Sequence, residues 1–386
     1  MSGELTIRQA RDARSRRAFL RLPFDLYRGN SNWVPPLRSA QKRLFACRTA
    51  FFSRAQMALF LARRDGKTVG RIAAIHNRAH NEHRGDKVGF FGYFECDRSD
   101  TQAAHALLDR AADWLAGRGL EVIRGPVNPC MNAECGLLVD GFDRPPMVMM
   151  PYNPPAYERL LTEWGLSKCK DLYAYLIEAD NLRPGTPGHQ RLRRVAAAAR
   201  RRHPEISVRA LDMRHFERDV LEFLAVFEQA RSDNWGHVPL TEDEITETAR
   251  AMKPILDPQI ALLAEVDGKP AGASLGIPNV NRALAAINGR LWPLGFLRFA
   301  REMRRISEIR ALGIGALPEY RHLGITAILL LETILRGTAR GIRTAEASWI
   351  LEDNAMSNRT IGKNLQPRRY KTYRIYEGST HSANRT

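Results

Sequence analysis

The sequence has few cysteines and no long apolar run. Its five cysteines, an odd number, form no Cys-x-x-Cys pair, which excludes a zinc ribbon or a disulfide scaffold and favours a reducing compartment. The longest apolar stretch, Leu323–Leu335, contains Glu332 and is shorter than the roughly 18–20 residues that span a bilayer. The N-terminus lacks the apolar segment of a secretory signal. We therefore expect a cytoplasmic protein, at most peripheral at the inner membrane surface.

Acidic residues are outnumbered by basic ones. The 59 lysines and arginines exceed the 42 aspartates and glutamates, so the net charge is +17. Such a surface attracts nucleic acid, acidic lipid or a phosphorylated cofactor, and it is equally typical of a soluble protein from an arginine-rich proteome. The segment 191–203, RLRRVAAAARRRH, predicts a basic helix. We expect a solvated connecting helix or, as the alternative, a surface for phosphate or acidic lipid.

A repeat runs through the chain at one constant spacing. Asn32-Trp33 returns as Asn234-Trp235, and Asp65-Gly66 returns as Asp267-Gly268, both 202 residues later (234 minus 32, and 267 minus 65). A chain of 386 residues has room for two domains. The repeat predicts two copies of one fold, in 1–180 and 205–386, joined by a linker and the basic helix in 181–204.

Each copy shows the same order of expected elements. A strand leads into a helical region, a hairpin follows at the Asp-Gly turn, and strand, helix, strand, helix and strand complete the copy. In the second copy we expect strand 206–210, helix 216–231, hairpin 260–277, strand 309–317, helix 325–338, strand 344–351, helix 355–363 and strand 371–377. This alternation indicates an α/β fold in which each copy has a mixed sheet flanked by helices.

Each copy also has an insertion of its own. Beyond Asn279 the spacing becomes 222 (330 minus 108), so the second copy gains residues between Asn279 and Leu330. The spacing returns to 201 at Asn354 (354 minus 153), so the first copy gains residues around 128–150. Segments that only one copy contains are candidates for function.

A motif with ligand-binding chemistry follows the strand 309–317. Arg321-x-x-Gly324-x-Thr326 lies where that strand is succeeded by an apolar helix. Backbone N–H groups of a glycine turn converge at the positive end of the helix, and Arg321 adds a fixed charge. The pattern predicts an anion-binding turn. The first copy has Ser99 where the second has Arg321, and we expect it to have lost this site.

This motif resembles the pyrophosphate-binding loop of the GNAT acyltransferases, (Arg/Gln)-x-x-Gly-x-(Gly/Ala), and the order of elements resembles that fold twice over. The sequence departs at Thr326, whose branched Cβ narrows the approach. The resemblance implies two tandem GNAT folds and acyl-CoA as co-substrate. It implies that the end of the strand and a later asparagine contact pantetheine, while the turn binds pyrophosphate. The implied cofactor-binding residues are Ile314, Gly315, Ala316, Leu317, Arg321, His322, Leu323, Gly324, Ile325, Thr326 and Asn354.

Longer segments resemble one group of these enzymes. The segments are 348–355 and 370–377 in the second copy, and 70–78, 89–95, 124–146 and 153–166 in the first. They resemble tandem-GNAT N-acyltransferases that include the bacterial ceramide synthases, which acylate long-chain amino alcohols from acyl-CoA. The resemblance implies an N-acyltransferase that acts on an amphipathic or long-chain amine, with a sphingoid base as one candidate.

Candidate catalytic carboxylates lie on the strand after the cofactor helix. Alternation along 344–352 puts Glu346, Ser348 and Glu352 on one face, and a buried carboxylate can be a base with a raised pKa. Glu352 and Glu346 are therefore the candidates. A helix cap at Glu352 and an arginine pair at Glu346 are the structural alternatives. Many GNAT enzymes have a tyrosine acid at the position occupied here by Ile361, so the acid is unassigned.

The insertion of the first copy supplies polar candidates for the acceptor. Asn128, Asn132 and Glu134 suit an amine with hydroxyl groups, and turn formation is the alternative. Trp235 lies in the helical region that shapes acceptor pockets in GNAT enzymes, and ordinary packing explains it equally well.

The insertion of the second copy interleaves apolar residues with arginines along 288–310. Such an amphipathic stretch suits a membrane interface or a channel for an acyl chain, with Trp292 and Phe296 as candidates for lipid contact. A flap that covers the sheet with ordinary core aromatics is the alternative.

Rival functions follow from the same fold. A small-molecule or protein N-acetyltransferase would use acetyl-CoA, and an aminoacyl-tRNA-dependent transferase would bind tRNA through 191–203 with steep salt dependence. A binding module with a dead acyltransferase fold is a third. We expect acyl-CoA, the amine acceptor and the periphery of an anionic membrane as partners, and no specific nucleic acid. We expect no metal, since the histidines of 76–83 have no clear third ligand.

Overall fold

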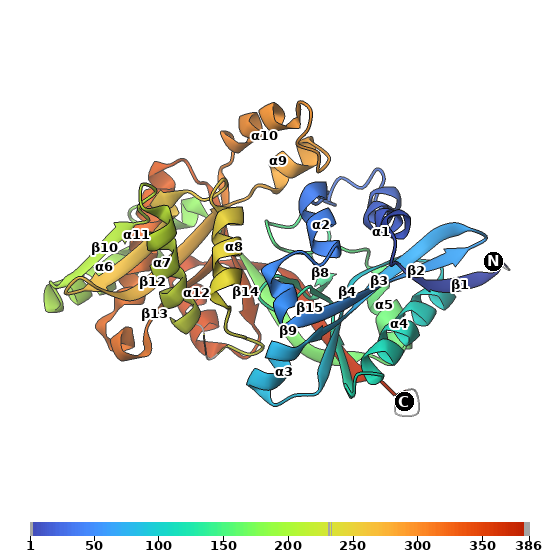
Figure 1. Ribbon diagram of the computed structural model, residues 1–386. Coiled ribbons are helices and arrows are strands. Elements are labelled where there is room, and N and C mark those ends of the chain that lie inside the picture. Colours follow the sequence, from blue (N-terminus) through green and yellow to red (C-terminus); the bar gives the residue numbers. More distant parts are fainter. Residues whose placement is uncertain (1–2, 231, 233, 382–386) are drawn as a thin grey trace. The chain divides into compact units, whose positions relative to one another are not determined.

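The computed structural model describes residues 3–230, 232 and 234–381 (Figure 1). Internal packing divides the chain into two compact units. Unit 1 comprises Met1–Leu172, Leu284–Phe299 and Lys371–Thr386, and unit 2 comprises Tyr173–Ala283 and Ala300–Tyr370. Residues of both units occur in α9 (Asn281–Ala286), α10 (Gly295–Met303), β9 (Ser167–Glu178) and β15 (Arg368–Ser379). The boundaries at 180 and 205, which concern the sequence copies, stay a prediction.

Unit 1 contains a mixed sheet. Its strands are β1 (Leu5–Gln9), β2 (Ala55–Arg64), β3 (Lys67–Asn77), β4 (Val88–Cys96) and β5 (Val122–Gly125). Pairing is antiparallel from β1 to β4 and parallel between β4 and β5. A two-stranded ribbon of β6 (Val127–Asn128) and β7 (Glu134–Cys135) precedes β8 (Leu137–Asp140). The helices are α1 (Ala13–Leu26), α2 (Arg38–Phe45), α3 (Arg78–Arg84), α4 (Thr101–Ala116) and α5 (Ala156–Glu163).

Helices cover both faces of this sheet. Arg71 of β3 donates from Nη1 to the carbonyl oxygen of Phe19 in α1 (2.8 Å), whereas its neighbour Ile72 belongs to the core cluster that contains α4. Because successive side chains of a strand point to opposite faces, α1 and α4 lie on opposite sides of the sheet.

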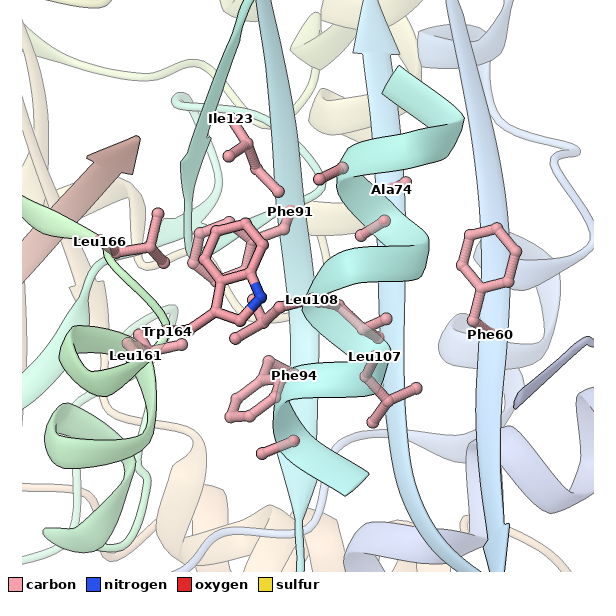
Figure 2. Packing of buried hydrophobic residues seen from close by; sticks show 14 of the residues in the cluster. Phe60, Ala74, Phe91, Phe94, Leu107, Leu108, Ile123, Leu161, Trp164 and Leu166 are labelled. Atoms are coloured by element: carbon pink, nitrogen blue, oxygen red, sulfur yellow. The ribbon is translucent and has the colours of Figure 1, made fainter. Parts of the chain in front are cut away.

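The core of unit 1 lies between α4 and the sheet. Figure 2 shows Leu107 and Leu108 of α4 against Phe60, Phe91 and Phe94 of the strands, all of them buried. Apolar residues recur along α4 at helical spacing, so one face of the helix is continuous with the core. The sheet and this helix thereby form a rigid scaffold for the loops at their ends.

Unit 2 has the same arrangement. Its strands are β10 (Ile206–Ala210), β11 (Ala261–Val266), β12 (Lys269–Pro278), β13 (Glu308–Ala316) and β14 (Thr344–Leu351). Pairing is antiparallel from β10 to β13 and parallel between β13 and β14. The helices are α6 (Pro187–Arg202), α7 (Phe216–Ala230), α8 (Glu242–Met252), α11 (Ile325–Ala339) and α12 (Ala355–Leu365). The sequence copies thus repeat one order of strands and one pattern of pairing.

The two central hairpins are built alike in detail. Asp65 and Asp267 have positive φ angles of 49° and 50°, and each is followed by a glycine with positive φ. A β-bulge interrupts the β2–β3 pair after Ala62 and the β11–β12 pair after Ala264, again 202 residues apart (264 minus 62). Turn and bulge therefore recur at the spacing of the sequence repeat.

The last strand completes unit 1. Residues 372–379 of β15 pair antiparallel with β8 and β5. Lys371 is fully buried, and its Nζ donates to the carbonyl oxygens of Gly141 and Arg144, the latter at 2.7 Å. Unit 1 is therefore made from both ends of the chain.

Several elements differ from the expectation. The sequence did not indicate α2, α3, α8 or the β6–β7 ribbon, and the basic helix α6 begins at Pro187 rather than at 191. The expected end of α7, Arg231, lies outside the described residues. Within the described part of the chain, no helix has the length and apolar character to cross a membrane.

Candidate functional site

Two neighbouring strands of unit 2 diverge. β13 and β14 pair only over Glu308–Ala311 and Thr344–Ala347. β13 then continues alongside β12, and no strand among the described residues pairs with Leu312–Ala316 on the other side. In an antiparallel pair, some peptide groups point away from the partner, so this stretch presents an open edge of N–H and C=O groups. An extended ligand that contains amides can add to such an edge as a further strand would.

The stretch Ile314–Leu317, expected to contact pantetheine, is the end of this open edge. A Cβ on Gly315 would lie 3.0 Å from the Cβ of Ala230 in α7, so this position has little room for a side chain. Ala316 is buried on the opposite face, in the core cluster that also contains α11. Since both faces are packed, the backbone is the part of this stretch that a ligand can use.

A tight turn connects the open edge to α11. The chain passes through a 3-10 helix, Pro318–Leu323, and reaches Gly324 in a left-handed conformation with φ of 78°. The N–H of Ala327 donates to the carbonyl oxygen of Gly324 (3.0 Å). The N–H groups of Ile325 and Thr326 therefore lie at the start of the helix, where no intrahelical acceptor exists. This end of the helix dipole favours an anion.

The side chains around this turn are placed differently from one another. Arg321 and His322 are exposed, and Thr326 is half-buried. Leu323 packs against the core, and Ile325 is fully buried there. A ligand at the turn would meet the charge of Arg321 and the backbone, whereas Ile325 anchors the helix.

The basic helix α6 packs against α11. Its buried residues belong to the same core cluster as those of α11, and Arg200 forms a 2.7 Å ion pair with Glu332. A Cβ on Gly324 would lie 2.9 Å from the Cβ of Ala199. Ala199 therefore lies beside the turn, directly before Arg200 in the sequence. The helix is not a connector surrounded by solvent, because one face of it is core.

A buried polar group occupies the point where β13 and β14 diverge. Glu346 is fully buried, and it accepts hydrogen bonds from the hydroxyls of Ser348 and Tyr370. Arg310 lies directly opposite on β13; its Nε is 4.0 Å from the Glu346 carboxylate and donates to Ser348 Oγ (2.8 Å). Glu346 and Ser348 thus share a face, as the alternation predicts. Of these four residues, Tyr370 alone is half-buried, and the other three are buried.

Glu352 does not continue this face. β14 ends at Leu351 as expected, and Glu352 lies half-buried in the following turn, so it is not on the strand face that Glu346 and Ser348 share. Asn354, the expected pantetheine ligand, follows the strand as predicted and begins α12. Its Oδ1 accepts a hydrogen bond from the N–H of Ser357 (3.0 Å), which is a helix cap.

The polar candidates of the first insertion lie in unit 1. Asn128 and Glu134 are opposite one another in the β6–β7 ribbon, and Asn132 lies in the turn between these strands. Asn128 Oδ1 accepts from the backbone N–H of Tyr93 (2.6 Å), a residue of β4 with φ of 51°. The amide oxygen of Asn128 therefore stabilises a distorted strand.

In the first copy, the chain itself occupies the edge that is open in the second. β4 and β5 pair only over Val88–Phe90, and the ribbon then runs beside β4. A Cβ on Gly92 would lie 1.9 Å from the carbonyl oxygen of Val127. This close approach leaves no space for a ligand there and agrees with the loss of the anion-binding motif.

A second buried carboxylate, missed in the sequence, lies in unit 1. Glu95 Oε2 accepts from the hydroxyls of Tyr27 (2.8 Å) and Tyr157 (2.9 Å), and Arg71 lies 3.9 Å from Oε1. Burial raises the pKa of Glu95 to about 7, against the opposing effects of Arg71 and the two hydroxyls. A single carboxylate in the otherwise apolar strand GFFGYFEC was the signal available.

The three aromatic candidates differ in their exposure to solvent. Trp235 is half-buried in the loop between α7 and α8. Trp292 and Phe296 are exposed around the start of α10, with ring centroids 5.9 Å apart. Their exposure excludes the alternative in which they form an ordinary core.

Among the described residues, no three His, Cys, Asp or Glu side chains are grouped so that they could hold a metal ion.

Solved structures share this architecture. A tandem GNAT protein from the clavulanic acid biosynthesis pathway aligns with 98% of this chain and 99% of its own, at a TM-score of 0.58 and 12% identity. A GCN5-related N-acetyltransferase from Sphaerobacter thermophilus aligns with 98% of this chain and 96% of its own, at a TM-score of 0.52 and 15% identity. The predicted fold, two tandem GNAT folds, is confirmed.

Known sequences add the enzyme class. No family model matches the chain. A bacterial ceramide synthase from Caulobacter vibrioides is 33% identical over 369 residues, covering 93% of each chain. Protein YghO from Escherichia coli is 30% identical over 367 residues, covering 94% of this chain and 92% of its own. The fold and these relatives define a tandem-GNAT N-acyltransferase, as the sequence resemblance implied. Within that class, the chain belongs to the bacterial ceramide synthase family.

Proposed function

We propose that this enzyme transfers a long acyl group from acyl-CoA to the primary amine of an amphipathic amino alcohol, with a sphingoid base as the acceptor. The observation that carries the donor assignment is the open edge Leu312–Ala316, which leads directly into the Gly324 turn at the start of α11. An extended arm with two amides fits the edge, and a pyrophosphate fits the turn. The name of the Caulobacter relative supports the acceptor.

The residues present fit this donor. The edge offers backbone groups, the turn offers N–H groups at a positive helix end, and Arg321 is an exposed cation of the turn itself. Thr326 is half-buried, so its methyl and hydroxyl border the turn without closing it. Bound acyl-CoA supplies the activated thioester. The protein supplies position, which can contribute on the order of 7–11 kcal/mol to such a reaction.

The proton of the amine needs a route. During the reaction the amine nitrogen bonds to the thioester carbon, the carbon–sulfur bond breaks, and a proton passes from nitrogen to the sulfur leaving group. We propose that Tyr370 handles this proton, because its hydroxyl donates to Glu346 and it is the one residue of the group that is not buried. Glu346 is fully buried and cannot touch substrate, so it acts through Tyr370. Ser348 and Arg310 keep Glu346 in place.

The function is tested by thiol release. Purified protein receives acetyl-CoA or palmitoyl-CoA, each with and without sphinganine. We expect release from palmitoyl-CoA that depends on sphinganine. Release from acetyl-CoA instead would establish the acetyltransferase rival. Release from neither donor would overturn the proposal and turn attention to the aminoacyl-tRNA-dependent and binding-module rivals.

The donor site is tested with a matched pair of glycine variants. Gly324→Ala forces a Cβ onto a left-handed residue and against Ala199, and it should abolish palmitoyl-CoA binding. Gly341, just past the other end of α11, has φ of 81° and open space around it. Gly341→Ala therefore imposes a similar backbone strain, roughly 1–2 kcal/mol, and should bind palmitoyl-CoA normally. Equal binding by both variants would refute the donor site.

A further inference from the structure

Large apolar side chains are exposed together in one short segment. Trp292 is 81% exposed, Leu294 70%, Phe296 46% and Leu297 59%. Elsewhere in the described part of the chain, the comparable residues are Val195 on α6 and Leu335 on α11. Apolar clusters of this kind on a protein surface mark contact with a membrane or another molecule.

The segment is folded although its side chains project. The N–H of Arg38 donates to the carbonyl oxygen of Gly289 (3.0 Å), and the N–H of Phe296 donates to that of Leu291 (2.8 Å). Arg298 Nη1 donates to the carbonyl oxygen of Ala286 (3.2 Å). The backbone is therefore held from both sides of the apolar residues, and their exposure is not that of a loose loop.

Within residues 290–301 the charge has one sign, and the next residue, Glu302, is paired with Arg282 and Arg305. No acidic residue occurs between Gly268 and Arg301, whereas Arg290, Arg298 and Arg301 are present and exposed. Arg301 lies one helical turn after Leu297 in α10, so it is adjacent to the apolar residues. Long basic side chains at the border of an apolar surface can keep their charges at the level of lipid headgroups.

We propose that the segment Arg290–Arg301, called here the interfacial segment, inserts its four apolar side chains into the surface of an anionic lipid bilayer. Its arginines then lie among negatively charged headgroups, which attract basic residues near the membrane. A second copy of the chain is disfavoured as the occupant, because a self-complementary contact would bring arginines against arginines with no acid in the segment. This inference is independent of the proposed reaction.

The test is flotation of the full chain with vesicles, and it requires no activity. Vesicles of phosphatidylcholine that contain phosphatidylglycerol are compared with vesicles of phosphatidylcholine alone. We expect the protein to bind the anionic vesicles more tightly. The double variant Trp292→Ser/Leu297→Ser should lower binding by about tenfold or more, because it removes two inserting side chains. The control Val195→Ser/Leu335→Ser removes two exposed apolar residues elsewhere and should bind as the natural chain does.

The charge component is tested separately. Arg290→Gln/Arg301→Gln should remove most of the preference for phosphatidylglycerol, whereas Arg193→Gln/Arg194→Gln on exposed positions of α6 should keep it. Equal binding by the Trp292→Ser/Leu297→Ser variant and the natural chain would overturn the proposal. Light scattering without vesicles gives a second possible contradiction. If the natural chain is an oligomer and Trp292→Ser/Leu297→Ser is a monomer, the segment binds a second copy of the chain and the proposal is overturned. The proposal would also be overturned if the natural chain did not bind vesicles and Trp292→Ser/Leu297→Ser lowered the affinity for palmitoyl-CoA. In that case the segment would contact the acyl chain instead of a membrane.

Discussion

Replacement of Glu95 by glutamine should change how the stability of this protein depends on pH. Glu95 is buried in unit 1 and held by Tyr27, Tyr157 and Arg71. Burial raises its pKa from 4.5 to about 7. Glutamine has nearly the same shape and can accept the tyrosine hydrogen bonds, but it has no carboxyl proton to lose.

The sign and size of the effect follow from proton linkage. Between pH 4.5 and about 7, folded Glu95 keeps its proton while the unfolded carboxyl has lost it. The folded state therefore binds more protons, and the free energy of unfolding falls as pH rises through this interval. A shift of this size corresponds to about 3 kcal/mol at most. Above pH 7 both states are ionised, and this contribution no longer changes.

The assay is urea unfolding at several pH values across that interval, followed by tryptophan fluorescence. The natural chain should lose stability with rising pH, and Glu95→Gln should remove the part due to this carboxyl. Glu163→Gln, which removes an exposed carboxylate of α5 paired with Arg159, is the control and should leave the slope unchanged. An identical slope in Glu95→Gln and the natural chain would refute the assignment.

Three further substitutions separate chemistry from structure. Tyr370→Phe should lower kcat by a factor on the order of 10²–10⁴ with palmitoyl-CoA binding intact, as measured by steady-state kinetics and calorimetry; normal turnover would remove Tyr370 from the proton route. Glu352→Gln, in the turn beyond β14, should lower turnover far less than Tyr370→Phe, and an equal loss would restore Glu352 as the principal candidate. Asn128→Ala should reduce the free energy of unfolding by about 1–3 kcal/mol, because the N–H of Tyr93 loses its acceptor. If Asn128 also binds the acceptor amine, KM for sphinganine rises as well, and unchanged stability would contradict the structural role.

Local sequence patterns predicted the repeated framework well. The Asp-Gly turns, the apolar alternation and the glycine turn at Gly324 are encoded by neighbouring residues, and the corresponding elements lie within a few positions of the expectation. The strands 206–210 and 344–351 have the expected bounds. The constant spacing of the repeat added information, because a weak pattern in one copy supported its equivalent in the other.

Contacts between distant residues were beyond that reasoning. Tyr370 meets Glu346 across strands of the sheet, and Tyr27, in the turn after α1, meets Glu95 although it lies 68 positions earlier in the chain. Neither pairing follows a local period, so the sequence suggested Glu346 without its tyrosine and did not suggest Glu95. The chain itself fills the edge beside Gly92, which likewise depends on how an insertion folds back.

The final strand imposes an order on biosynthesis. Residues 372–379 of β15 pair with β5 and β8, so the sheet of unit 1 lacks a strand until these residues have left the ribosome. The strands β10–β14 of unit 2 have all emerged before then. Although β1–β5 of unit 1 precede every strand of unit 2 in the chain, the sheet of unit 1 is completed only after those strands have been made. Until that moment β5 has an unpaired edge, which is the kind of surface that aggregates or engages chaperones in a nascent chain.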